Sequence, residues 1–185
     1  MAPSRRTSPS DIFTLPPDAP HHSGSRSGGV LTLGLIDGEA AVELGQAFSA
    51  LSPWVVYPYS AAALQAYFEG SRPDAPRYCL RSGDTLIGAL GLQLNWLRGP
   101  YIQFLGVLPA HQAAGTGARV LEWVEAQARE RADRNLWVAA SDFNARALSF
   151  YERHGFQRVS VLDGLVQDGR DEVLLRKRLQ VVGPG

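Results

Sequence analysis

The stretch "HQAAGTGARVLEWVE", residues 111–125, decides the fold: two glycines bracket a threonine just before a helical pattern. The run before it, "YIQFLGVLP", residues 101–109, is largely apolar, ends in proline, and predicts a buried strand. A helix N-terminus leaves backbone N–H groups without partners and carries a partial positive charge. The glycines either permit a tight turn or let these amides converge on an anion, and their spacing leaves both interpretations open.

Two well-known phosphate motifs do not fit this junction. A P-loop requires Gly-Lys-Ser/Thr, whereas Gly117 is followed by Ala118 and Arg119. The dinucleotide fingerprint G-x-G-x-x-G/A requires a small third residue, but Val120 stands there. The sequence therefore argues against a P-loop nucleotidase and against a nicotinamide oxidoreductase.

Composition limits the class of protein. The chain has 185 residues, enough for one domain, and its 18 basic and 18 acidic residues balance. We therefore expect neither nucleic acid nor a membrane as partner. The single cysteine, Cys79, excludes an internal disulfide and a cysteine-rich metal site; we interpret it as a small buried side chain and expect no metal. No secretory signal or membrane-length apolar run is present, so a cytoplasmic location is the default expectation.

The chain divides into a tail and a domain. Residues 1–28 are rich in Pro, Ser and Gly and predict a disordered tail, followed by a single domain over 29–182. Alternation and helical spacing predict a mixed α/β domain with an antiparallel meander and one crossover. The expected strands are 30–36, 77–81, 85–96, 101–108, 135–141, 156–162 and 172–179, and the expected helices are 38–51, 60–70, 115–133 and 144–155.

Two segments resemble one enzyme family. Gln112-x-x-Gly115-x-Gly117 matches the Q/R-x-x-G-x-G/A signature of the GNAT N-acetyltransferase superfamily, which binds acetyl-CoA. Downstream, the segment 144–156 is similar to the family's N-x-x-A-x-x-[FL]-Y-x-x-x-G-F pattern. Either match alone is weak, but both occur in order on a strand–helix–strand–helix frame. The resemblance covers roughly residues 30–180 and implies a GNAT-like fold: a mostly antiparallel central sheet flanked by helices, with strands splayed at the cofactor site.

The resemblance also implies a cofactor site for acetyl-CoA. Backbone N–H groups of the junction would hold the pyrophosphate, and the strand before it would pair with the pantetheine arm, with an N–H there polarising the thioester carbonyl. Gly106 would mark a bulge that splays this strand. The implied residues are Leu105, Val107, Gln112, Ala113, Ala114, Gly115, Thr116, Gly117 and Ala118.

Three residues of the second segment have two interpretations each. Tyr151 matches the family tyrosine that donates a proton to the leaving thiolate, but its helical spacing also suits a core residue. Asn144 suits a helix N-cap and, by resemblance, a contact to the cofactor arm. Ala147 suits close approach of the cofactor or ordinary helix packing.

The acceptor side is less defined. The aromatic segment 52–60 contributes Trp54, Tyr57 and Tyr59, which either wall the acceptor site together with Tyr101 or form a lid over the core. Glu69, Tyr101 and Asp142 are conceivable bases, and none is favoured. Asp163 or Glu172 could bind a cationic amine, although an exposed polar turn explains both.

The sequence thus predicts an N-acetyltransferase that moves an acetyl group from acetyl-CoA to a primary amine, on a small molecule, a peptide or a protein, by direct attack. The alternative is a non-catalytic acyl-CoA-binding or regulatory module on the same fold. A homodimer is compatible with the sequence, which identifies neither the oligomeric state nor the acceptor.

Overall fold

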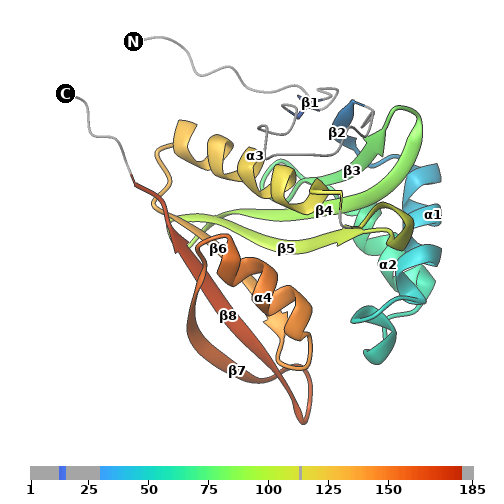
Figure 1. Cartoon of the computed structure of the whole chain (residues 1–185). Helices are drawn as coiled ribbons and strands as arrows, with labels where there is room; N and C mark the ends of the chain where they lie inside the picture. Colours follow the sequence, from blue (N-terminus) through green and yellow to red (C-terminus); the bar gives the residue numbers. More distant parts are fainter. Residues whose placement is uncertain (1–12, 16–29, 113, 181–185) are drawn as a thin grey trace.

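The computed structural model describes residues 13–15, 30–112 and 114–180 (Figure 1). It contains an eight-stranded sheet in the order β1-β2-β3-β4-β5-β6-β8-β7, in which only β5 and β6 are parallel. The predicted mixed α/β fold with a mostly antiparallel sheet is confirmed. The strands are β1 Phe13–Thr14, β2 Leu31–Leu35, β3 Arg77–Ser82, β4 Thr85–Trp96, β5 Gly99–Val107, β6 Asn135–Ser141, β7 Gln157–Gln167 and β8 Arg170–Arg178.

Four α-helices and two short 3-10 helices connect the described strands. They are α1 Gly38–Ser49, η1 Trp54–Val56, α2 Ala61–Glu69, η2 Pro109–His111, α3 Thr116–Glu130 and α4 Ala145–Arg153. Among the described residues, no helix combines the length and apolarity that crossing a membrane requires.

The helices cover the two faces of the sheet unequally. Buried residues of α3 and α4, such as Val120, Leu121 and Leu148, form one core with side chains from strands β2 to β6 and from β8. On the opposite face, α1 and α2 form a second core that contains Phe48, Cys79 and residues of β4 and β5. Residues of β6 and β8 are absent from this second core, so that half of the face is free to form a site.

The two helices α1 and α2 lie unusually close together. A Cβ atom added to Gly45 of α1 would lie 2.7 Å from the carbonyl oxygen of Ala61 and 2.9 Å from the amide nitrogen of Gln65. Only glycine allows this contact, because real Cβ atoms do not approach backbone so closely. The contact positions the η1 segment, which lies between the two helices in the chain.

The parallel strands β5 and β6 pair only over a short length. Their ladder consists of Tyr101 with Trp137 and Ile102 with Val138, although β5 continues to Val107 and β6 to Ser141. Beyond the ladder the strands diverge, as the resemblance implied. The β7–β8 hairpin turns away from the β2–β5 part of the sheet in Figure 1.

Three expectations need correction. Phe13–Thr14 pairs with β2 and Leu15 is buried, so these residues are not part of a disordered tail; the rest of segment 1–28 lies outside the described residues. Gly106 is not a bulge, because the register shift falls at Gln103. Gly106 instead packs against Phe48, since a Cβ atom added to this glycine would lie 2.6 Å from the Phe48 ring.

The third correction concerns the closing hairpin. The sequence predicted a long connection over residues 163–171, but β7 runs to Gln167 and β8 begins at Arg170. Gly169, with a φ of 76°, sits in the tight turn between them. The register jumps from Leu162 opposite Glu172 to Gln167 opposite Arg170, so residues 163–166 form an irregular part of β7 that no alternating pattern indicates.

Candidate active site

A cavity of about 980 Å³ opens where β5 and β6 diverge. The N-terminal ends of α3 and α4, the η1 segment and β8 complete its walls. Of the predicted site residues, Ala113 lies outside the described residues and Ala114 does not line the cavity. All the others line it: Leu105, Val107, Gln112, Gly115, Thr116, Gly117, Ala118, Asn144, Ala147, Tyr151, Trp54, Tyr57, Tyr59 and Tyr101.

The N-terminus of α3 has no side-chain cap. Gly115 occupies the N-cap position with a φ of 76°, a conformation that favours glycine, and none of the described side chains caps the first turn. The first bond into this turn runs from the Arg119 N–H to the Gly115 carbonyl, at 3.1 Å. The amides of Thr116, Gly117 and Ala118 come before this first helical hydrogen bond and therefore have no partner within the helix. All three residues line the cavity.

Gly117 is required for another reason. A Cβ atom at this position would lie 3.1 Å from Cζ of Phe150 on α4, which is tighter than ordinary contact. The beginning of α3 therefore approaches α4 closely. Gly115 thus makes the turn and Gly117 allows the close approach, while the convergence of the amides on an anion stays a prediction.

The free part of β5 presents backbone groups toward this cavity. The Leu108 N–H donates to the Ile87 carbonyl on β4, at 2.8 Å. Because successive N–H groups of a strand point to opposite sides, the backbone groups of Leu105 and Val107 point away from β4, toward the diverging β6. The Gln112 side chain donates from Nε2 to the Val107 carbonyl, at 2.8 Å, and thereby ties the junction to the strand.

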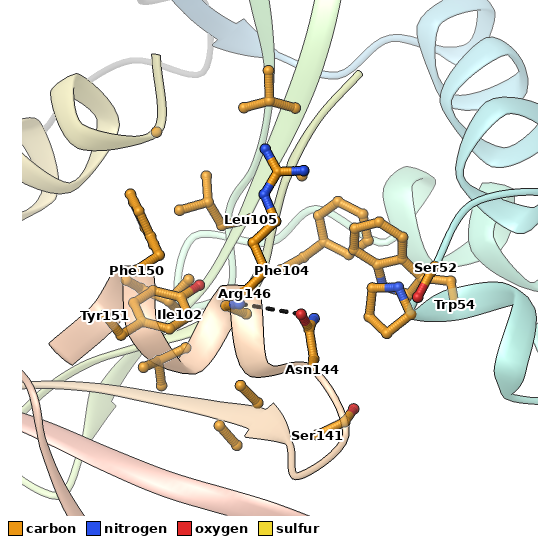
Figure 2. Close-up of a pocket in the computed structure, with 18 of the residues that line it drawn as sticks. Ser52, Trp54, Ile102, Phe104, Leu105, Ser141, Asn144, Arg146, Phe150 and Tyr151 are labelled. Carbon is orange, nitrogen blue, oxygen red and sulfur yellow. Dashed lines mark hydrogen bonds between the residues drawn. The ribbon is translucent and has the colours of Figure 1, made fainter. Parts of the chain in front are cut away.

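The N-terminus of α4 is capped in the usual way. Oδ1 of Asn144 accepts the Ala147 N–H at 3.1 Å, the bond drawn in Figure 2. The N-cap interpretation of Asn144 is thus confirmed, while its contact to a cofactor stays a prediction. Sequence reasoning missed Arg146 and Arg153, which line the same cavity. Their spacing of seven, two helical turns, was the signal that could have identified them.

Tyr151 packs in the core, as one of its two interpretations predicts, and it also lines the cavity. Its ring is 6% exposed and packs in the α3–α4 core, with the Phe156 ring centroid 5.4 Å away. The residue also lines the cavity, and no described residue forms a hydrogen bond with its hydroxyl. Burial, followed by the proximity of Tyr101, raises the pKa of Tyr151 above its ordinary value. The phenol therefore stays protonated at neutral pH, and its role as proton donor stays a prediction.

A buried polar cluster lies on the other wall. Tyr57 is within hydrogen-bond reach of Ser141 Oγ, at 2.8 Å, and of Glu172 Oε1. A phenol has one proton, so Tyr57 donates to the carboxylate and Ser141 donates to Tyr57. Burial and, next, the bond to Glu172 raise the pKa of Tyr57 to about 12. Glu172 is 6% exposed and lines the cavity, whereas Asp163 is exposed and does not.

The remaining aromatic residues act as both wall and core. Trp54 stacks on Phe104, with ring centroids 4.6 Å apart and an interplanar angle of 19°, while Tyr59 is 37% exposed at the cavity. Tyr101 contacts Trp96 at 4.8 Å, and burial raises the pKa of Tyr101.

Two of the conceivable bases do not reach the cavity. Glu69 accepts a hydrogen bond from Gln65 at the surface, and Asp142 is exposed; neither lines the cavity. Within the described ranges, no group of three or more His, Cys, Asp or Glu side chains is arranged to hold a metal ion.

Solved structures share this fold. The ribosomal-protein-S18-alanine N-acetyltransferase from Escherichia coli superposes with a TM-score of 0.66 at 17% identity, covering 84% of this chain and 97% of that one. An acetyltransferase from Thermus thermophilus gives 0.65 at 19% identity, covering 80% and 97%. A GNAT family acetyltransferase from Elizabethkingia anophelis with acetyl-CoA bound gives 0.59 at 15% identity, covering 80% and 98%.

Sequence comparison gives the family directly. The model of the acetyltransferase (GNAT) family matches residues 43–156, a span that extends from α1 through the α3 junction to the end of the α4 segment. It includes both segments on which the resemblance rested, Gln112 to Gly117 and Asn144 to Phe156. The chain therefore belongs to the GNAT family of acetyltransferases.

Proposed function

We propose that this protein is an N-acetyltransferase that transfers an acetyl group from acetyl-CoA to a primary amine by direct attack. One observation carries the proposal: the uncapped amides of α3, the free edge of β5 and the Tyr151 hydroxyl belong to one cavity. The structural relative from Elizabethkingia anophelis, solved with acetyl-CoA bound, supports the choice of acyl donor.

The diphosphate of CoA would bind at the start of α3. The amides of segment 112–118 provide donors, and the partial positive charge of the helix end favours an anion. Each charge-assisted hydrogen bond contributes about 1.5–3 kcal/mol. Arg146 and Arg153, on the facing helix α4, line the same cavity and add positive charge.

The pantetheine arm would extend β5 as an added strand. Leu105 and Val107 offer backbone groups on the side from which β6 has diverged, and an amide-bearing chain can pair with such an edge. Gln112 already satisfies the Val107 carbonyl, so the Val107 N–H and both backbone groups of Leu105 remain for the arm and the thioester carbonyl.

The chemistry would need no covalent enzyme intermediate. The neutral amine nitrogen attacks the thioester carbon, the C–S bond breaks, and the thiolate takes the proton of the Tyr151 hydroxyl. The new amide nitrogen then loses its extra proton, which restores the Tyr151 hydroxyl. The only cysteine, Cys79, is 5% exposed, donates to the Gly34 carbonyl at 3.4 Å and does not line the cavity, so it is not the acyl carrier.

Calorimetry and a turnover assay test the proposal together. We expect CoA and acetyl-CoA to bind, and CoA thiol to be released when acetyl-CoA is mixed with a panel of primary amines. Absence of binding to both CoA compounds would refute the site. Tight binding without turnover on any amine would leave the alternative function, a non-catalytic acyl-CoA-binding module.

A further inference from the structure

The half of the sheet face that α1 and α2 leave uncovered is where we looked for an acceptor site. Val173 and Leu175 of β8 pack in the α3–α4 core, so the alternating residues Glu172 and Leu174 face the opposite side. That side is the one on which α1 and α2 pack, but they cover only the β2–β5 half. Glu172 and Leu174 therefore lie on an open sheet face beside η1.

Glu172 is a buried carboxylate without an ion-pair partner among the described residues, although the charge of Arg170 acts on its hydrogen-bond partner Tyr57. It is 6% exposed, and no Lys, Arg or His of the described chain forms an ion pair with it. Tyr57 donates to Oε1, whereas Oε2 accepts no hydrogen bond from any described residue. Buried carboxylates are rarely left without a positive partner, because desolvation opposes the charge. An ammonium group entering the cavity would supply that partner.

The cavity beyond Glu172 is uncharged and mostly aromatic and aliphatic, with two glutamines. A second cavity, of about 440 Å³, adjoins the first and shares Tyr101, Gln103 and Leu165 with it. Its other lining residues are Gln93, Trp96, Leu162 and Leu174, so none of its lining residues is charged.

The lip of the first cavity is apolar as well. Leu165 is 57% exposed, and Val166 and Tyr59 are each 37% exposed, all three lining the cavity. Exposed apolar side chains gathered at a cavity mouth are typical of a binding site for an apolar group.

We propose that the acetyl acceptor is a cationic primary amine with an apolar substituent. The ammonium group binds Glu172 Oε2, and the substituent lies along Tyr101, Leu165 and Leu174 toward the second cavity. This assignment rests on the proposed acetyl transfer and specifies its substrate. Amines that carry a second charge are disfavoured, because the second cavity offers no partner for it.

The proton balance of the reaction fits this position. The ammonium passes one proton to the Glu172 carboxylate, and the free amine forms the new C–N bond. As the C–S bond breaks, Tyr151 gives its proton to the thiolate. The nitrogen then loses its second proton, which restores the Tyr151 hydroxyl, and Glu172 releases its proton to water.

An amine panel tests the substrate class. We expect kcat/KM to be at least about tenfold higher for 2-phenylethylamine and hexylamine than for ethanolamine and putrescine. A short peptide with an N-terminal phenylalanine separates a peptide acceptor from a small amine, since both share the same chemistry. A preference for ethanolamine or putrescine would overturn the apolar assignment.

Matched variants test the residues. Glu172→Gln should raise the KM for 2-phenylethylamine by about 10- to 100-fold, because a charge-assisted bond is lost, while the exposed control Glu122→Gln leaves it unchanged. Glu172→Asp, which keeps the charge, should recover part of the loss. Leu165→Ser should raise the KM for 2-phenylethylamine by about fivefold and leave that for ethanolamine unchanged; Val161→Ser, on the same strand and 59% exposed, is its control.

Binding measurements separate this inference from the proposed function. Acetyl-CoA affinity should stay within about twofold in all these variants, which also shows that they are folded, and calorimetric titration of 2-phenylethylamine into CoA-bound protein should show the same Glu172 dependence as the KM. Loss of acetyl-CoA binding in the unaltered protein would refute the proposed function. Turnover with an unchanged amine KM in Glu172→Gln would refute only the Glu172 assignment.

Discussion

The N-termini of α3 and α4 face one cavity and are built in opposite ways. At α4, Asn144 accepts the Ala147 N–H, as Asp37 and Ser60 accept amides at α1 and α2. At α3, the N-cap is Gly115, and no side chain in the part of the chain that the structure describes caps the first turn. The N-termini of α1, α2 and α4 are thus capped by a side chain. The N-terminus of α3, whose sequence matches the family's Q/R-x-x-G-x-G/A signature, is not.

This difference indicates a division of labour. Glycine at the N-cap position of α3 costs only a few tenths of a kcal/mol relative to Ser, Asp or Asn, so the open end is nearly neutral for stability. Under the proposed function, a phosphate of the ligand would take the place of the missing side-chain cap. The capped helix α4 instead holds Tyr151 rigidly in the core. Under the proposed function, α3 would bind the cofactor and α4 would carry the proton donor.

The largest expected effect tests the role of α4. Tyr151→Phe removes the hydroxyl and keeps the ring that packs against Phe156. We expect kcat to fall by about 100-fold, because general acid catalysis is lost, with the Kd for acetyl-CoA nearly unchanged. Steady-state kinetics and calorimetry measure the two values. Equal kcat values for the two proteins would remove Tyr151 from the chemistry.

The second effect tests the role of α3. Ala118→Asp places a negative charge in the first turn, which should stabilise the helix by about 0.5 kcal/mol through its dipole. The same charge would repel a diphosphate, so the affinity for CoA should fall by at least about tenfold. Thermal unfolding and calorimetry measure these opposite changes.

The matched control lies on a helix away from the cavity. Ala62→Asp makes the same change in the first turn of α2, and Ala62 is exposed and does not line the cavity. It should gain similar stability and keep its CoA affinity. If Ala118→Asp behaved in the same way, the open end of α3 would not be an anion site.

The third effect compares the side-chain cap of α4, Asn144, with that of α2, Ser60. Asn144→Ala should lower the free energy of unfolding by about 1 kcal/mol, as should Ser60→Ala at the equivalent position of α2. Asn144→Asp keeps a capping oxygen but loses the amide donor. If the side chain also contacts the cofactor arm, this variant keeps its stability and binds acetyl-CoA more weakly; unchanged affinity would restrict Asn144 to capping.

The smallest effect concerns Tyr57, which lines the cavity on a wall other than the two helix ends. Burial and the bond to Glu172 raise the pKa of Tyr57 to about 12, from 10.0. A raised folded-state pKa stabilises the protein fully below pH 10, and this stability is lost as the pH rises toward 12. Chemical denaturation between these values should show a shallower loss in Tyr57→Phe. An identical slope would contradict the buried bond.

Local sequence predicted the starts of α3 and α4, beside the cavity, well. The residues of segment 112–118 and of segment 144–155 act within a few positions of one another, so their spacing already encodes the turn, the caps and the helix faces. Strand and helix order followed from periodicity for the same reason. The roles of these residues toward acetyl-CoA remain predictions.

The acceptor side was less predictable, because its contacts are long-range. Tyr57 and Glu172 are 115 positions apart, and no local pattern distinguishes a buried glutamate at a strand start from a glutamate in a polar turn. The sequence did not predict the pairing of Phe13 and Thr14 with β2 for the same reason. The two strand residues lie in a segment rich in Pro, Ser and Gly, which predicts disorder.

Gly45 shows how selectivity can be governed from a position that touches no ligand. Since even a methyl group there would press on the Ala61 carbonyl, replacing this glycine would push the first two helices apart. The segment between them carries Tyr57, so the carboxylate opposite would lose its donor and the acceptor chamber its shape. Evolution of a new amine preference in this scaffold could therefore begin at a helix–helix contact, with the acyl-donor half of the enzyme left intact.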